Sequence, residues 1–304
     1  GGRLYGRGTA DDKGAAVVAL YCLKALKDER VKCVRKARAI FGAGEEIASD
    51  DLKQYFQREA LPELAFTPDA EYGVCNREKG ILHVELSAPA DGSRLESLHG
   101  GTVRNAVAAS ARAEARCTAE ECEALEALSK KMDGKFSFQG SGGVLTAECA
   151  GRAAHAMEPQ KGRNAAARLV RLFSSCFGGE ALGALWSFVD QKIGLELDGS
   201  SLGLRREDAV SGPLTVNLGV AEQDNGVCRA VLDIRYPVTA DGEEIFERLR
   251  AAAGAYGVKA RVLAEQKPLF VPEDTPLIRM LKGAYETVTG GRARLYGTGG
   301  GTYA

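Results

Sequence analysis

The chain has 304 residues, of which 45% are hydrophobic and 27% are charged, and its formal net charge is -1 at pH 7. This length suits about two domains, at roughly 150 residues per domain. The charge balance shows no basic excess of the kind that nucleic-acid binding requires. No apolar run approaches the roughly 20 residues of a membrane span, and no signal-peptide pattern is present. We therefore expect a soluble protein without nucleic-acid or membrane partners.

Eight cysteines are spread along the chain, and no two of them have the CxxC spacing of a metal or redox motif. Cys22 lies within the apolar run VVALYCLKAL, as a packed free thiol would. This usage favours reduced thiols over a disulfide framework and predicts a cytoplasmic protein.

The first functional candidate is the stretch LYGRGTADDKGAA at residues 4–16. It sets Asp11 and Asp12 between a glycine-rich approach and an apolar run that predicts a helix, packed on one broad face, over 14–27. A carboxylate at such a junction serves as a helix cap, a metal ligand or both. The local pattern leaves these alternatives open.

Strand-like and helix-like segments alternate in the next part of the chain. Residues 36–43 predict a short buried strand, 49–59 a helix with its capping residues, and 63–66 another short strand. This alternation predicts an α/β unit with a mostly parallel sheet and flanking helices.

Four acidic residues follow the predicted strand ends, and they are Asp11, Glu45, Glu46 and Asp69. Sites in such sheets usually lie at the carboxyl ends of the strands. We therefore expect these side chains to meet in one crevice.

The pattern changes at Gly80, because residues 81–89 alternate apolar and polar side chains as a half-buried strand does. Further strand-like segments lie at 102–115, 143–150, 214–220 and 227–236. The last two flank Asp224-Asn225-Gly226, a strong hairpin signal. Helical segments lie at 120–132, 163–176, 180–189 and 243–255. Strands with helices on one side predict an inserted α+β domain.

A helix start at Asp274-Thr275-Pro276 marks the return to the first domain. The predicted organisation is an α/β domain in two parts, residues 1–79 and 267–304, with the α+β domain inserted at 80–266.

The acidic residues suit a two-metal site. Such a site is about 3.5 to 4 Å across and needs a ligand that bridges both ions, which a carboxylate does with its two oxygens. Asp11, Glu46 and Asp69 suit its acidic half, and Glu45 suits a general base toward a water molecule. The alternative is that the same residues are exposed caps and loop charges, and the pattern alone does not separate the two.

Eight motifs occur in order along the chain, and they are GRGTADDKG, GAGEE, TPDAEYG, NREKG, GGTVRNAV, GRAAHAMEP, DIRYP and GGGTYA. Together they resemble the signature of the M20 family of co-catalytic metallopeptidases, closest to its PepV-like dipeptidase branch. The resemblance covers nearly the whole chain. It implies that the α/β domain is catalytic and that the inserted α+β domain is its lid.

The resemblance also implies roles for the acidic residues. Asp11 is implied as the bridging ligand, Glu46 and Asp69 as ligands of one metal each, and Glu45 as the general acid/base. The implied cofactors are two divalent metal ions, with zinc expected and manganese or cobalt as alternatives.

On the substrate side, the resemblance implies that His155 donates to the tetrahedral oxyanion and that Asn105 is a polar lid contact. It implies that Arg235 clamps the free C-terminal carboxylate of the substrate, because a planar guanidinium binds both oxygens at once. Gly300 suits a close approach of the backbone to a peptide substrate.

The sequence departs from the family pattern at Ala106 and Ala108, where the usual Met and Pro fall. This departure weakens the resemblance for the loop geometry but not for Asn105. His83 and His99 lie outside the motifs, and we expect them to be structural.

The family's metal site also uses a histidine from an upstream H-x-D motif and a late histidine, and neither is found in these 304 residues. All three histidines fall within the predicted lid, so none substitutes for them. We expect the chain to be an internal portion of the enzyme with an incomplete metal site.

The leading functional hypothesis is metal-dependent hydrolysis, by water attack, of dipeptides with a free C-terminal carboxylate. The expected partner is a small peptide substrate. One alternative is an amidohydrolase acting on N-acyl amino acids, and another is an inactive fragment with only a binding function. The long insertion is compatible with the enlarged lid of the PepV-like branch, and this resemblance implies a monomer rather than a dimer.

Overall fold

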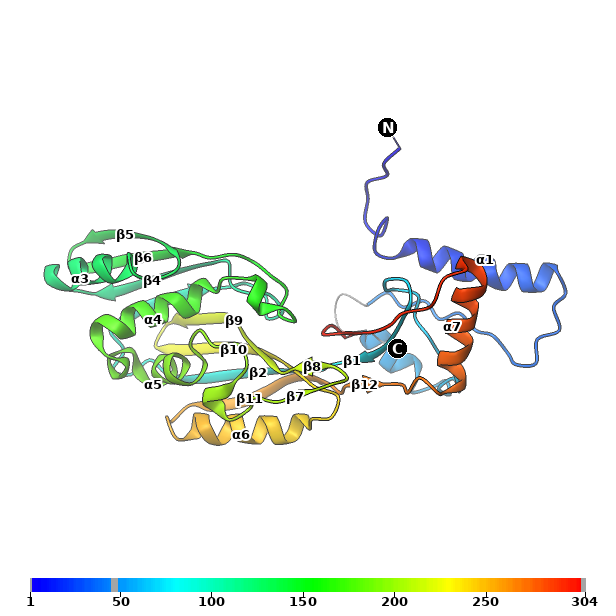
Figure 1. Cartoon of the computed structure of the whole chain (residues 1–304). Helices are drawn as coiled ribbons and strands as arrows, with labels where there is room; N and C mark the ends of the chain where they lie inside the picture. The colour runs from blue at the N-terminus through cyan, green and yellow to red at the C-terminus, as the bar shows by residue number, and fades with distance from the viewer. Residues whose placement is uncertain (1, 45–48, 302–304) are drawn as a thin grey trace. The chain divides into compact units, whose positions relative to one another are not determined.

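The computed structural model of the chain describes residues 2–44 and 49–301 (Figure 1). They form two compact units. The first unit holds the described residues of 1–75 together with 273–295, and the second holds Asn76–Pro272 and Tyr296–Gly301. Within the described ranges, no helix has both the length and the apolar composition needed to cross a membrane.

The helices of the first unit are α1 (Lys13–Asp28), α2 (Asp50–Tyr55) and α7 (Pro276–Thr289). The predicted start of α7 is confirmed, because Thr275 is its N-cap and Pro276 its first residue. A proline at that position loses no helical hydrogen bond. α2 ends before the predicted residue 59, because Arg58 N–H bonds to the carbonyl three residues back, at Tyr55, and the chain tightens into turns.

Asp12 caps α1, since its carboxylate accepts a hydrogen bond from the backbone N–H of Ala15 at 3.1 Å. The helix predicted over 14–27 is confirmed, but its predicted packing is wrong for the described structure. α1 has no buried residue, and Val18 and Tyr21 expose more than half of their surface. Its apolar face therefore lacks a cover among the residues that the structure describes.

Residues 36–43 and 63–66 form no strand, contrary to the prediction. Phe41 is 56% exposed and Phe66 is 64% exposed. A strand of a parallel sheet is normally buried on both faces by its neighbours, and these two segments lie at the surface instead. The mixed α/β class is confirmed by the helices and strands of the chain, whereas these two strands are not formed.

The second unit is built on an eight-stranded sheet with the order β11-β2-β10-β9-β3-β4-β6-β5, in which every neighbouring pair is antiparallel. The strands are β2 (Gly80–Pro89), β3 (Leu95–Gly100), β4 (Ser110–Arg116), β5 (Lys135–Ser141), β6 (Val144–Ala150), β9 (Thr215–Asp224), β10 (Val227–Tyr236) and β11 (Lys259–Gln266). The predicted hairpin between β9 and β10 is confirmed. Asn225 and Gly226 adopt φ of 50° and 78°, as a tight hairpin turn requires.

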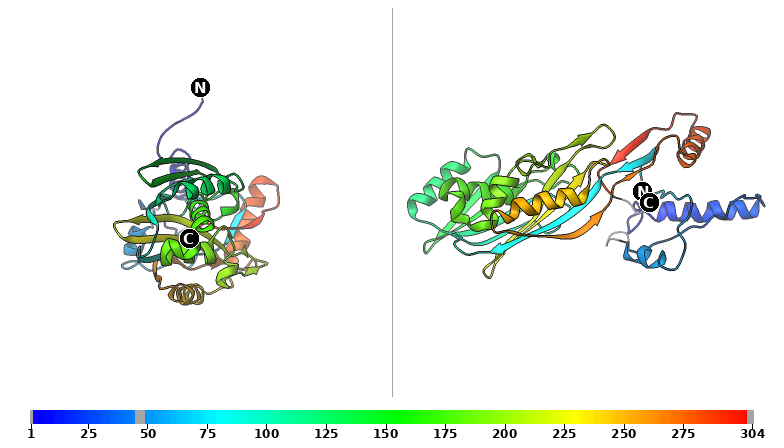
Figure 2. Two further views of the ribbon diagram at one scale, coloured as in Figure 1. Left: turned by 90° about the vertical axis from the view of Figure 1, so that its left-hand side faces the viewer. Right: turned by 90° about the horizontal axis from the view of Figure 1, so that it is seen from below.

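Four helices pack on this sheet, as the views in Figures 1 and 2 show. They are α3 (Ala119–Ser129), α4 (Ala165–Phe177), α5 (Gly183–Phe188) and α6 (Gly242–Gly254). Their apolar side chains share one buried core with alternate residues of the strands, including Leu82, Val84 and Leu86 of β2. The prediction of strands with helices on one side is therefore confirmed.

The other side of the central strands carries charge. Glu85 of β2 accepts from Arg229 of β10 and from Arg261 of β11, each at 2.7 Å, and Arg229 also donates to Glu222 of β9 at 2.9 Å. The His83, Asp233 and Arg235 side chains described below arise from the same faces of β2 and β10.

A small sheet has the order β12-β1-β13, formed by β1 (Val74–Glu78), β12 (Leu269–Phe270) and β13 (Leu295–Thr298). Beyond β1, the backbone N–H of Lys79 donates to the carbonyl oxygen of Thr298 at 3.1 Å. This bond fixes the residues after β13 against the start of β2.

Candidate functional site

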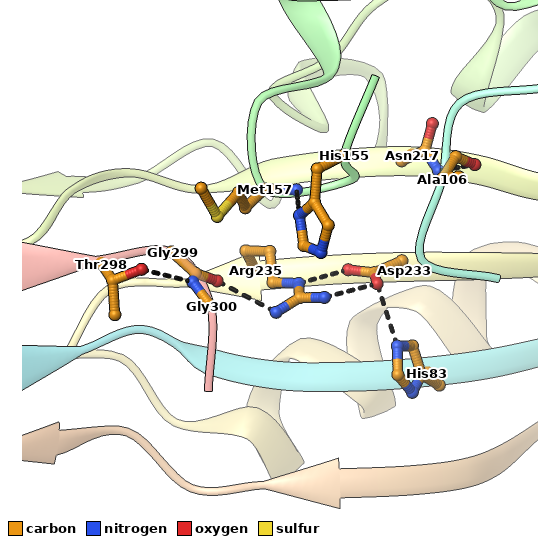
Figure 3. A network of polar contacts seen from close by, with 10 residues as sticks. All are labelled: His83, Ala106, His155, Met157, Asn217, Asp233, Arg235, Thr298, Gly299 and Gly300. Carbon is orange, nitrogen blue, oxygen red and sulfur yellow. Dashed lines mark hydrogen bonds and ion pairs between the residues drawn. The ribbon is translucent and has the colours of Figure 1, made fainter. Parts of the chain in front are cut away.

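The site begins with a buried pair on β10, Asp233 and Arg235. Residues two apart on a strand point to the same face, so the two side chains lie side by side. Arg235 donates from Nε to Oδ1 of Asp233 at 2.6 Å and from Nη2 to Oδ2 at 2.8 Å. Asp233 is fully buried and Arg235 is 3% exposed. This fork holds the guanidinium plane in one orientation (Figure 3).

The third nitrogen of the guanidinium, Nη1 of Arg235, donates to the carbonyl oxygen of Gly299 at 3.0 Å. The next residue, Gly300, donates its backbone N–H to Oγ1 of Thr298 at 3.0 Å. This turn after β13 places Gly300, the glycine predicted to approach the substrate, close to Arg235 (Figure 3).

His83 binds the same carboxylate. The register of β2 and β10 sets His83 opposite Asp233, and its Nε2 lies 2.9 Å from Oδ2 of Asp233. Burial acts to raise the pKa of Asp233, but the hydrogen bonds from His83 and Arg235 outweigh it and lower that pKa below its usual range. Asp233 is therefore ionised at neutral pH, and Nε2 of His83 is the donor.

The predicted lid residues Asn105 and His155 lie on two paired segments. Ala106 and His155 form an antiparallel bridge, and the backbone N–H of Ala156 donates to the carbonyl oxygen of Asn105 at 2.9 Å. Nδ2 of Asn217, on β9, donates to the carbonyl oxygen of Ala106 at 2.9 Å and ties this pair to the sheet. The structure thus brings Asn105 and His155 together, and both are exposed.

The imidazole of His155 points toward the Asp233–Arg235 pair (Figure 3). Met157 donates its backbone N–H to Nδ1 of His155 at 3.1 Å, so the proton of the neutral ring is on Nε2. The surrounding protein atoms partly shield the His155 ring from water although the residue reaches the surface, and this desolvation lowers the pKa of His155. The positive charge of Arg235 lowers it further. His155 therefore presents a neutral ring with an Nε2–H donor.

Two of the predicted metal ligands, Asp11 and Asp69, lie in the first unit. Asp11 is exposed and Asp69 is partly buried, while Glu45 and Glu46 lie outside the described residues. Across residues 2–44 and 49–301, no group of three or more His, Cys, Asp or Glu side chains is placed to hold a metal ion. Carboxylate oxygens suit divalent cations, so the chemistry of the donors fits the implied metals. The assignment of Asp11, Glu46 and Asp69 as ligands stays a prediction.

Two residues of this site are not among the predicted site residues. They are Asp233, which no motif singles out, and His83, which the sequence predicts to be structural. A period-2 reading of DIRYP would have found Asp233, because it shares a strand face with Arg235. His83 has no comparable signal, since its contact depends on the register of strands 150 residues apart.

The whole chain, residues 1–304, matches the model of the protein family described as peptidase family M20/M25/M40. The chain belongs to this family, and the resemblance indicated by its motifs is confirmed.

Curated relatives are similar over the full length of the chain. It is 32% identical over 312 residues to the "Putative dipeptidase YtjP" of Bacillus subtilis (strain 168), covering 100% of this chain and 67% of that protein. It is 30% identical over 313 residues to the "Putative dipeptidase SH1171" of Staphylococcus haemolyticus (strain JCSC1435), covering 99% of this chain and 66% of that protein. The chain thus spans about two thirds of the length of these relatives.

Solved structures show weaker similarity. The M20 family metallo-carboxypeptidase Sso-CP2 from Sulfolobus solfataricus matches with a TM-score of 0.49 and 15% identity, covering 98% of this chain and 65% of that chain. Human carnosine dipeptidase 1 matches with a TM-score of 0.46 and 11% identity, covering 97% of this chain and 61% of that chain.

Proposed function

We propose that the complete protein is a metal-dependent dipeptidase that cleaves peptides with a free C-terminal carboxylate. Membership of the peptidase family supports hydrolysis of an amide bond, and two similar proteins carry the name of putative dipeptidases. The observation that supports a substrate with a free C-terminal carboxylate is the fixed orientation of the Arg235 guanidinium.

Arg235 is proposed to bind the carboxylate of the substrate. A guanidinium has five N–H groups, and the contacts to Asp233 and Gly299 use three of them. Among the described residues, each Nη nitrogen therefore retains one N–H. Two such donors on one rigid plane match the two oxygens of a carboxylate. Recognition of that carboxylate favours short substrates with a free carboxyl end.

His155 is proposed to stabilise the oxyanion. Its Nε2–H is available because Nδ1 accepts from Met157, and its ring points toward Arg235, where the substrate would lie. A donor held in advance of the reaction stabilises the charge that develops on the carbonyl oxygen. Asn105, on the segment paired with that of His155, is proposed to contact the substrate, and so is Gly300.

Asp11, Glu46 and Asp69 are proposed to hold two divalent ions, zinc or alternatively manganese or cobalt. When bound, such ions polarise the carbonyl group and lower the pKa of the attacking water. Glu45 is proposed to accept the proton of that water and to pass it to the leaving amine.

The test is a panel of substrates given to the complete protein. We expect hydrolysis of free dipeptides and strong loss of hydrolysis when the C-terminal carboxylate is amidated. Replacement Glu45→Gln should reduce kcat at least about 100-fold, in line with the contribution of a general base. Faster turnover of N-acyl amino acids than of dipeptides would instead favour the amidohydrolase. Wild-type turnover by Glu45→Gln would contradict the proposed mechanism.

A further inference from the structure

The proposed substrate contact is one end of a buried chain of hydrogen bonds that crosses two strands. It runs from Arg235 and Asp233 on β10 to His83 on β2 (Figure 3). We propose that His83 and Asp233 are positioning residues that set the orientation of Arg235 for the substrate carboxylate. This inference rests on the proposed function of Arg235.

The guanidinium needs such support because an arginine side chain has several freely rotating bonds. Ordering them costs conformational entropy, and an arginine ordered before the substrate arrives does not incur that cost on binding. The fork to Asp233 supplies the order, since two parallel hydrogen bonds set both the position and the plane of the guanidinium. It also turns the edge bearing Nη1 toward Gly299, where the segment that holds Gly300 begins.

Asp233 in turn depends on His83. Oδ1 of Asp233 accepts from Nε of Arg235, while Oδ2 accepts both from Nη2 of Arg235 and from Nε2 of His83. The donor from His83 approaches from the neighbouring strand and opposes rotation of the carboxylate about its Cβ–Cγ bond. Loss of this donor would let the carboxylate turn, and the fork would turn with it.

The neighbouring carboxylate does not compete for His83. Glu85 lies two residues along β2, on the same face, and it accepts from Arg229 and Arg261 at 2.7 Å each. His83 is 8% exposed, and its Nδ1 is buried without a hydrogen-bond partner among the described residues. Among the described residues, the imidazole of His83 therefore makes its hydrogen bond to Asp233, which in turn binds Arg235.

The experiment compares His83→Leu, His83→Gln and His99→Leu in the complete protein, with a free dipeptide as substrate. Leu removes the donor, and we expect KM to rise about tenfold with kcat within about twofold, as loss of one charge-assisted hydrogen bond predicts. Gln places an amide N–H near the position of Nε2, and it should recover most of that loss. His99 lies on β3, outside the network, so His99→Leu should leave both constants unchanged.

The variant Arg235→Lys distinguishes a failure of this inference from a failure of the proposed function. If Arg235→Lys leaves KM unchanged, Arg235 does not bind the carboxylate and the proposed function is wrong at that point. If Arg235→Lys raises KM but folded His83→Leu does not, the positioning role is wrong while the proposed function stands. In the Arg235→Lys background, His83→Leu should add no further change in KM, and an additive change would overturn the inference.

The wild-type protein supplies a test that needs no variant to fold. The ¹⁵N spectrum of the imidazoles at neutral pH should show His83 with a proton on Nε2, because an ionised Asp233 accepts and does not donate. An unprotonated Nε2 on His83 would overturn the proposed hydrogen-bond chain.

Discussion

The backbone N–H of Met157 donates to Nδ1 of His155 at 3.1 Å, and this hydrogen bond determines which nitrogen of the neutral imidazole is a donor. Because Nδ1 accepts, the proton of the neutral ring lies on Nε2, on the side that faces Arg235 (Figure 3). The tautomer that the proposed oxyanion contact requires is thus set by the backbone two residues along, before any substrate binds.

Replacement of His155 tests this donor. We expect His155→Ala to lower kcat about 100- to 1,000-fold, which is typical for loss of one oxyanion donor, with a smaller change in KM. Lys161→Gln is a suitable control, because Lys161 is exposed in the same loop and forms a surface ion pair with Glu158. A His155→Ala variant whose kcat stays near that of the control would contradict the assigned role.

The protonation of His155 gives a pH prediction. Burial and the charge of Arg235 lower its pKa from the ordinary value of 6.5. An unfolded chain therefore binds a proton at a higher pH than the folded chain does. The stability linked to His155 is fully present above pH 6.5 and is lost as the pH falls below that value. In an NMR titration of the folded protein, the His155 ring should titrate with a midpoint below 6.5, and a midpoint above it would contradict the lowered pKa.

Replacement of Asp233 tests the energetics of the buried pair. Asp233→Ala leaves the guanidinium of Arg235 buried without its counter-ion, and we expect a loss of about 3 to 5 kcal/mol in the free energy of unfolding. Glu222→Ala breaks the more exposed pair with Arg229 and should cost less than about 1 kcal/mol. Urea unfolding of both variants measures the difference.

The pH dependence of Asp233 follows from its lowered pKa. Its contribution to stability is present above the ordinary carboxyl pKa of about 3.9 and is lost as the pH falls through the lowered value in the folded state. If Asp233→Ala and Glu222→Ala lowered the free energy of unfolding equally at pH 7, the buried pair would contribute no more to stability than the exposed pair, contrary to the prediction.

The substitution Gly219→Ala tests whether the loop that carries Asn105 packs against β9. It lies at the irregularity in β9, between the residues that pair with Val231 and Leu232 of β10. A Cβ at this position would lie 2.2 Å from the carbonyl oxygen of Arg104. Because that atom belongs to the backbone, no rotamer change relieves the clash. We expect Gly219→Ala to lower both stability and kcat.

A matched glycine controls for the general effect of this substitution. Gly283 lies within α7, and a Cβ there meets nothing within 4 Å. Gly283→Ala should raise stability by about 0.5 to 1 kcal/mol, because alanine is the better helix former. If Gly219→Ala also proved stabilising, the loop at residue 104 would not pack against β9 as described.

Removal of metal tests the proposed cofactor. Dialysis of the complete protein against a chelator should abolish hydrolysis, and zinc, manganese or cobalt should restore it. Asp11→Asn should weaken this restoration, whereas Asp12→Asn should affect it less, because Asp12 caps α1. Full activity in protein shown to be free of metal would contradict the proposal.

Local signals in the sequence predicted much of the second unit. The Asn225-Gly226 turn, the alternation in β2 and the starts of α3, α4 and α6 each depend on a few adjacent residues, and all agree with the structure. The short strands β3 and β5 escaped prediction, because their pairing partners rather than their own composition define them. Residues 36–43 show the reverse case, since their strand-like composition has no pairing partner among the described residues.

The sequence by itself determined the family of this protein and the kinds of chemistry available to it, because its motifs are runs of adjacent residues in a set order. Only the tertiary structure decided which polar groups meet. The motif of Arg235 implies that this side chain binds the carboxylate of a substrate, but it does not show that Asp233 holds the guanidinium. Nor does any motif show that His83, which lies outside all of them, holds Asp233. Such a contact depends on which strands pair and in which register, and the hydrogen bonds of a whole sheet set that register together.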